Sequence, residues 1–269
     1  MLAEGVHSLA NCFDGALLLL GQSRARKPPD DDHPFGYGRE EYFWSLIVAI
    51  VFFALGAGVA IYEGVRHVLY PQPAGDPKWS YIVLAASALF DGASFVVGLK
   101  QFRREARGRG YWATVRHSKN PSLFSVVLED TADLTGLALA FLGIFLGHAL
   151  GLPWLDGAAS IAIGLVIAAV AIVLLVETHG LIIGERASPE LMAAVRARAE
   201  QEPGVRRVAG ISSLHVGPSE IVVVLELEFM PEATAADVHR GVAAISTDLR
   251  REHADVSRVL FEAVAETRD

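Results

Sequence analysis

The sequence contains a single cysteine, Cys12, so no disulfide can form within the chain. It also lacks an excess of positive charge: its formal net charge is −8, and we therefore expect no nucleic-acid partner. No basic segment precedes the first polar stretch, and we expect no cleavable signal peptide. These absences exclude a disulfide-stabilised scaffold and give no support to a nucleic-acid-binding protein.

Charge is also missing from four long segments. Residues 42–62, 134–150 and 157–176 contain no Asp, Glu, Lys or Arg, and residues 79–99 contain only Asp91. With its flanks, each segment reaches the roughly 20 residues that a helix needs to cross about 30 Å of hydrocarbon. Buried core helices are the alternative, but four of them would be unusual in one chain of this length. Together with a mean hydropathy of +0.37, the pattern predicts an α-helical membrane protein.

Five candidate spans follow from this pattern, and the first is the most polar. They cover about 2–21, 42–69, 79–99, 122–150 and 154–184. Basic residues gather in the loops 22–41 and 100–121, and basic loops stay cytoplasmic. We therefore expect these loops and the C-terminal tail to be cytoplasmic. The N-terminus would then lie outside, and we expect a further helix to precede Met1.

The tail has a different character, because its hydropathy falls after residue 186. Residues 188–202 and 233–253 have helical periodicity, with Ser188 as a candidate N-cap. Three β-branched or alternating segments, 205–217, 220–230 and 256–266, are typical of strands. The order α-β-β-α-β predicts a small open sheet with helices on one face. We therefore expect a transmembrane domain over 1–186 and an α+β cytoplasmic domain over 187–269.

Ionisable side chains inside a membrane span cost about 2.5–3.5 kcal/mol on insertion scales and usually have a function. Two stripes of polar residues at helical spacing stand out here. The acids of the fourth span are Glu129, Asp130 and Asp133. The polar residues of the first span are His7, Asn11 and Asp14. Imidazole, amide and carboxylate ligands from two packed helices suit a borderline divalent cation such as Zn, Mn, Fe or Co. For Glu129 alone, a capping role or a pair with an arginine at the membrane interface stays open.

Three further residues are candidates. Asp91 lies near the middle of its span, where it could carry a proton, bind the ion or form an interhelical hydrogen bond. In the acidic loop, Asp30 and His33 could bind a metal, although a solvated turn before a helix is the favoured interpretation.

Several motifs together resemble the cation diffusion facilitator family of metal transporters. EGVHSLANCFDGALLLLG resembles the family's second helix, and DDDHPFGYGREEYFWSLI resembles the loop that leads into its third helix. VVLEDTADLTGLALA resembles the fifth helix, and ETHGLIIGERASPE resembles the end of the sixth. The tail resembles the family's ferredoxin-like cytoplasmic domain. On this alignment the family's first helix is absent, in agreement with the orientation of the basic loops.

The resemblance implies an antiporter that exports a divalent cation in exchange for protons. It implies a homodimer of six-helix subunits in the bilayer, whose tails pair in the cytosol. It implies no enzymatic activity and no cofactor, because the metal is the transported substrate, with Zn the first candidate. His7 and Asp130 carry over directly as ligands of the transport site.

The sequence departs from the family pattern in the two helices of the proposed site. The aspartate of the motif on the second family helix falls on Asn11, and Asp14 follows one turn later. A frequent ligand position on the fifth family helix falls on Val126, for which Glu129 or Asp133 could substitute.

The remaining departures concern the loop and the tail. Asp30 and His33 match a second metal site of some members, but the other histidine of that site falls on Tyr37. In the tail, the metal-binding histidines of some members align near Leu225 and Glu262, so we predict no cytosolic binuclear site.

We therefore predict a divalent metal cation efflux transporter of the cation/proton antiport type. The alternative is a non-transporting membrane partner or metal sensor that keeps the fold with a degenerate site. Asn11 and Val126 favour the alternative.

Overall fold

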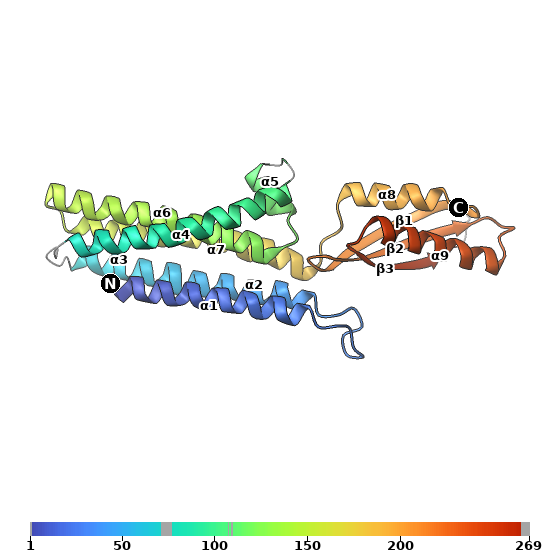
Figure 1. The fold of residues 1–269 in the computed structure, drawn as a ribbon, viewed down its shortest axis with the longest axis horizontal. Helices are drawn as coiled ribbons and strands as arrows, with labels where there is room; N and C mark the ends of the chain where they lie inside the picture. The colour runs from blue at the N-terminus through green and yellow to red at the C-terminus, as the bar shows by residue number, and fades with distance from the viewer. Residues whose placement is uncertain (1, 71–76, 107, 109, 265–269) are drawn as a thin grey trace. The chain divides into compact units, whose positions relative to one another are not determined.

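The structure is a computed structural model, shown in Figure 1, that describes residues 2–70, 77–106, 108 and 110–264. For residues 2–12, 77 and 117 it describes the backbone only. The chain divides into two compact units. The first contains Met1–Arg24 and Glu40–His179, and the second contains Ala25–Arg39 and Gly180–Asp269.

The first unit is helical throughout its described part. Its elements are α1 (Leu2–Ala25), α2 (Arg39–Val51), the π-helical turn η1 (Phe52–Ala57), α3 (Gly58–Leu69), α4 (Pro77–Ala106), α5 (Tyr111–His117), α6 (Pro121–Leu150) and α7 (Trp154–Ile183). Among the described residues, four helices are long and apolar enough to cross a membrane: Arg39–Leu69, Lys78–Ala106, Pro121–Leu150 and Trp154–Ile183. Four of the five predicted spans are therefore confirmed. The more polar α1 is a helix, but it is not among these four.

Large apolar side chains cover the outside of this unit. Leu89, Phe90 and Val176, for example, are 73%, 74% and 62% exposed. Such exposure would be unfavourable in water, whereas lipid tails solvate it well. The surface is therefore that of a membrane-embedded bundle.

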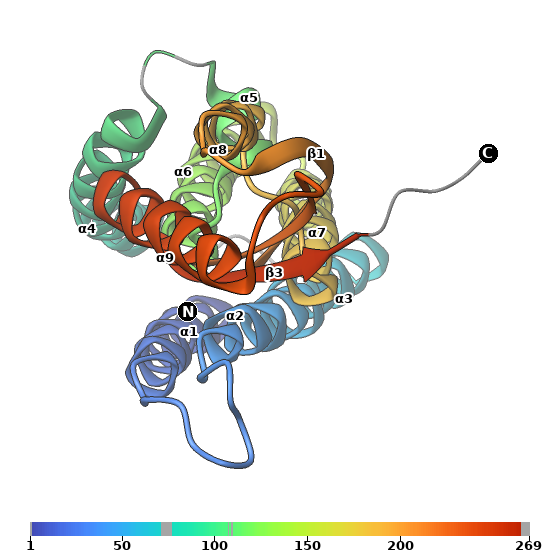
Figure 2. The ribbon, with the colours of Figure 1, turned by 90° about the vertical axis from the view of Figure 1, so that its right-hand side faces the viewer.

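Helix α6 has neighbours on more than one side, and Figure 2 shows the bundle along the helix axes with α6 between α4 and α7. It lies beside α4 over much of its length. It meets α7 where Gly136 faces Ile163, and it contacts α2 through a hydrogen bond from Ser122 to Glu41. Val126 packs in an apolar cluster that includes residues of α1. Neighbouring helices thus cover part of α6, and Ser125 and Asp133 are buried there.

The direction of the helices defines two ends of the bundle. In Figure 1, α1, α4 and α7 run one way, and α2, α3 and α6 run the other. The end at which α1 finishes and α2 and α6 begin carries the basic loops, and we call it the basic end. Helix α6 starts there with Pro121 at its first turn and the Asn120 side chain accepting a hydrogen bond from the Leu123 amide.

The second unit has the predicted α-β-β-α-β order. Its elements are α8 (Pro189–Glu200), β1 (Val205–Gly217), β2 (Glu220–Phe229), α9 (Ala235–Glu252) and β3 (Val256–Ala263). The strands lie in the order β1-β2-β3, with β1 antiparallel and β3 parallel to β2. Ser188 caps α8 by accepting a hydrogen bond from the Leu191 amide, as expected from the sequence.

Both helices of this unit cover the same face of the sheet. Arg198 on α8 forms an ion pair of 2.8 Å with Asp248 on α9. Beneath them, Val195, Leu225 and Ile245 are fully buried in one apolar core. The membrane bundle with a small α+β domain confirms the predicted fold class.

Candidate functional site

Helix α6 carries three acids in its membrane-spanning part. Asp133 is 6% exposed, and Glu129 and Asp130 are partly buried. Because the residues lie at i, i+1 and i+4, they do not all face the same neighbouring helix. The structure divides them between α1 and α4.

The side towards α1 holds Glu129 and Asp133. Asp14 on α1 is 2% exposed, and its charge acts on the Glu129 carboxylate together with the charges of Asp133 and Asp130. Among the described residues, Glu129 Oε1 has no hydrogen-bond partner. The structure thus brings Asp14 within electrostatic reach of Glu129, whereas a shared ligand site stays a prediction.

The side towards α4 holds Asp130. Its Oδ2 accepts a hydrogen bond of 2.9 Å from Ser94 Oγ on α4. The charge of Asp91, one turn before Ser94, also acts on Asp130. Asp91 thus lies beside the acidic group of α6. Ser94 was not predicted from the sequence, because a single serine in an apolar span gives no signal of what it faces.

Two of the predicted ligands, His7 and Asn11, lie in α1, but their side chains are outside the described residues. The pairing of His7 with Asp130 therefore stays a prediction. Within the described part of the chain, His, Cys, Asp and Glu form no group of three or more that could hold a metal ion.

Val126 has an apolar environment. It packs against Leu17, Leu18 and Val48, and Trp44 and Ile47 belong to the same cluster. No ligand to a cation comes from this position.

The chemistry of this group follows from its repeated carboxylates. Several carboxylates held close together in apolar surroundings repel one another when they are ionised. Either a divalent cation or protons relieve this repulsion, and both bind the same oxygen lone pairs. Carboxylates placed in this way are therefore suited to bind cations.

The acidic loop belongs to the second unit, and there the structure brings Asp30 and His33 together. His33 Nδ1 lies 3.5 Å from Asp30 Oδ1, and the His33 amide donates to the same oxygen at 2.8 Å. Tyr37 donates a hydrogen bond of 2.6 Å to Asp30 Oδ2, and Lys27 Nζ lies 3.7 Å from that oxygen. The Tyr37 hydroxyl, the His33 amide and the Lys27 ammonium lower the pKa of Asp30 below its ordinary value. Protein donors thus occupy both oxygens of this carboxylate.

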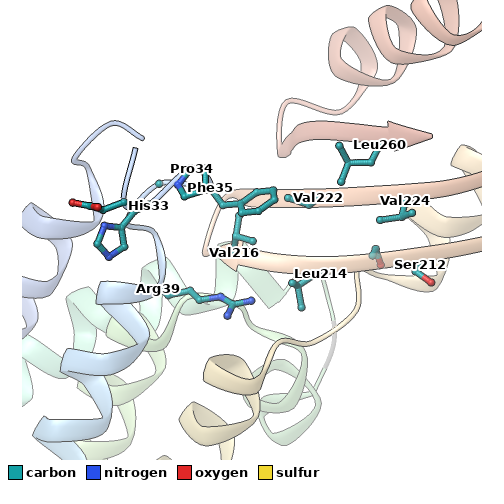
Figure 3. Close-up of a pocket in the computed structure, with 13 residues that line it drawn as sticks. His33, Pro34, Phe35, Arg39, Ser212, Leu214, Val216, Val222, Val224 and Leu260 are labelled. Carbon is teal, nitrogen blue, oxygen red and sulfur yellow. The ribbon is translucent and has the colours of Figure 1, made fainter. Parts of the chain in front are cut away.

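The same loop covers part of the sheet face that α8 and α9 leave open. Arg258 on β3 lies 5.1 Å from the Phe35 ring centre and donates a hydrogen bond of 2.6 Å to the Pro34 carbonyl. A side chain at Gly38 would meet the Val216 carbonyl at 2.6 Å, so only glycine allows this approach. A cavity of about 550 Å³ remains between the loop and the sheet, and Leu214, Val224 and Leu260 line its apolar wall, as Figure 3 shows.

Comparison with known proteins agrees with these features. Residues 1–183 match the family described as the cation efflux transmembrane domain. The chain is 31% identical over 231 residues to the human "Proton-coupled zinc antiporter SLC30A9, mitochondrial". The matched residues make up 85% of this chain and 41% of the antiporter. It is 31% identical over 233 residues to the Arabidopsis thaliana "Metal tolerance protein C4", covering 85% of this chain and 50% of that protein.

The chain thus spans about half or less of the length of these two relatives. Among solved structures, the nickel form of a MamM C-terminal domain variant is 22% identical, with a TM-score of 0.27. This match covers 30% of the present chain and 100% of the MamM chain.

Proposed function

The chain belongs to the cation efflux family, and on this basis we propose that it carries a divalent metal cation across the membrane in exchange for protons. It is an integral, multi-pass membrane protein. The observation that carries the proposal is the grouping of acids in the membrane-spanning part of α6, where Asp14 of α1 acts on Glu129, Asp133 is buried, and Asp130 is bonded to Ser94 of α4. Acids at such positions are costly unless they bind something.

In the proposed site, α1 supplies His7, Asn11 and Asp14, and α6 supplies the three carboxylates. The bundle alternates between states that open to one side of the membrane and to the other. On one side the metal displaces protons from these groups, and on the other side protons displace the metal. Asp91 is the candidate for proton coupling, because its charge acts on Asp130, and Ser94 orients the Asp130 carboxylate.

Zinc is the first candidate substrate, and Mn, Fe and Co are the others. A mixed set of carboxylate, amide and imidazole groups suits these borderline cations better than soft Cu(I). The similarity to a zinc antiporter supports the same choice.

The second candidate function is a non-transporting partner or metal sensor. The apolar environment of Val126 favours it, as does the absence of a three-ligand group among the described residues. In this case the acids of α6 would serve the fold, and no ion would bind between α1 and α6.

Calorimetric titration of the full chain with Zn²⁺ in detergent separates the two functions. A transporter binds zinc at an intramembrane site, and Asp130→Ala removes that binding. Asp156→Asn is the matched control, because Asp156 is a half-exposed acid near the start of α7, where it lies 3.6 Å from His67. Equal zinc binding by the parent and Asp130→Ala would support the partner or sensor.

We further propose that residues 187–269 and the basic loops lie on the cytoplasmic side, and that two copies of the chain pair through this domain. The basic loops support the sidedness. Chemical crosslinking of the full chain in vesicles, compared with a chain that ends at residue 186, tests the pairing. Dimers that persist in the shortened chain would contradict it.

A further inference from the structure

Four buried polar residues at the basic end have no place in the site described so far. Glu41 and Ser45 lie on α2, and Ser122 and Ser125 lie on α6. Glu41 is 9% exposed and both Ser45 and Ser125 are 1% exposed, although both helices belong to membrane spans. We call these four residues the serine–glutamate track.

The outer pair of the track is joined directly. Ser122 Oγ donates a hydrogen bond of 2.7 Å to Glu41 Oε1, which connects α2 and α6 at the basic end. The neighbouring Glu40 is held differently, because it accepts a hydrogen bond from Trp44 Nε1 and lies 3.9 Å from Arg24. Glu41 alone of the two acids is therefore turned into the bundle.

The inner pair continues the line towards the acids. Helices α2 and α6 run in the same direction, so Ser45 and Ser125 lie about one turn, or 5.4 Å, deeper than Glu41 and Ser122. Glu129 follows Ser125 on the same face of α6, four residues further on. The track thus leads from the basic end to the carboxylates.

The hydroxyls of the inner pair lack partners within the described part of the chain. Neither Ser45 Oγ nor Ser125 Oγ has a hydrogen bond, although both atoms are buried. On the same helix, Thr131 bonds back to the Val127 carbonyl at 2.6 Å and Thr135 bonds to the Thr131 carbonyl at 2.8 Å. Hydroxyls of this helix can therefore be satisfied by their own backbone, but those of Ser45 and Ser125 are not.

Because an unsatisfied buried hydroxyl is costly, water is the expected partner where several polar groups line one route. We propose that the serine–glutamate track is a hydrated passage between the basic end and the carboxylates of α6, with Glu41 as the first anionic group that a divalent cation meets. The role of the track in transport rests on the proposed function, whereas the hydration of the track does not.

Cysteine accessibility tests the hydration. In a Cys12→Ser background, Ser45→Cys and Ser125→Cys are exposed to a charged, hydrophilic methanethiosulfonate reagent in the full chain. Val127→Cys is the matched control, because Val127 is fully buried on the same helix but away from the track. We expect both track cysteines to react about tenfold or more faster than the control, since a thiolate needs water around it to form and react. Track cysteines as unreactive as the control would overturn the proposal.

Zinc flux into vesicles tests the role in transport. We expect Glu41→Gln and Ser125→Ala each to raise the zinc concentration for half-maximal flux several-fold, and Ser125→Thr to restore it. If the parent transports zinc and both variants show the same flux as the parent, only the role of the track in transport is overturned. A parent without zinc flux would instead contradict the proposed function, and the reactivity of the track cysteines would still decide whether the passage is hydrated.

Discussion

Ser94 on α4 holds the carboxylate of Asp130 on α6 through a hydrogen bond of 2.9 Å. This contact fixes one oxygen of the acid that the proposed site depends on most. It also means that a shift of α4 against α6 changes the orientation of the carboxylate. Ser94 is therefore a positioning residue in the proposed site.

Removal of this hydrogen bond should weaken metal binding. A hydrogen bond to a charged group contributes about 1.5–3 kcal/mol, so we expect Ser94→Ala to lower zinc affinity by about tenfold or more. Ser94→Thr keeps the hydroxyl and should restore most of the affinity. Calorimetry in detergent measures both. Zinc affinity of Ser94→Ala equal to that of the parent would show that Asp130 needs no support from α4.

The contact between α3 and α7 should tolerate no side chain at Gly64. A Cβ there would lie 2.7 Å from the Ile161 amide nitrogen and 2.8 Å from the Gly157 carbonyl oxygen, so the two helices would have to separate. We expect Gly64→Ala to destabilise the bundle by about 1–3 kcal/mol. Thermal unfolding in detergent measures this effect. Gly92→Ala on α4 is the control, because a Cβ there meets nothing within 4 Å, and equal melting temperatures for both variants would refute the packing argument.

The acidic loop should depend on pH through Asp30. Its pKa is lowered from 3.8, mainly by the hydrogen bond from Tyr37. A lowered folded-state pKa means that ionised Asp30 stabilises the loop fully above its ordinary pKa, and that this stabilisation is lost as the pH falls through the lower, folded-state value.

We therefore expect Tyr37→Phe to raise the pKa of Asp30 towards its ordinary value. A titration of carboxyl ¹³C shifts in the full chain, labelled at aspartate, measures the change. Tyr81→Phe removes a phenol from α4 instead and should leave the Asp30 titration as in the parent. An unchanged Asp30 titration in Tyr37→Phe would mean that other donors hold the carboxylate.

Much of this architecture follows from local sequence patterns. The charge-free segments predicted four membrane helices, because a run of apolar residues has few other stable environments. In the tail, the periodicity and the N-cap at Ser188 predicted the α-β-β-α-β order almost residue by residue. Each of these features depends on neighbours in the sequence, which is why the sequence alone was sufficient.

The remaining features depend on packing between distant segments. The spacing of Glu129 and Asp130 predicts adjacent positions on one helix, but only the packing shows that Asp14 faces the first and Ser94 the second. The grouping of Ala25–Arg39 with the C-terminal unit also depends on a contact between distant segments, in which Phe35 meets Arg258. The π-helical turn Phe52–Ala57 has no signal in its apolar sequence.

The central claim is that the carboxylates of α6 bind the transported cation in exchange for protons. The most direct test is zinc-dependent proton flux in vesicles that contain the full chain, measured with a pH-sensitive dye. We predict that the parent and Asp156→Asn show this flux and that Asp130→Ala abolishes it, with all three proteins eluting alike in gel filtration. Proton flux in Asp130→Ala equal to that of the parent would contradict the claim.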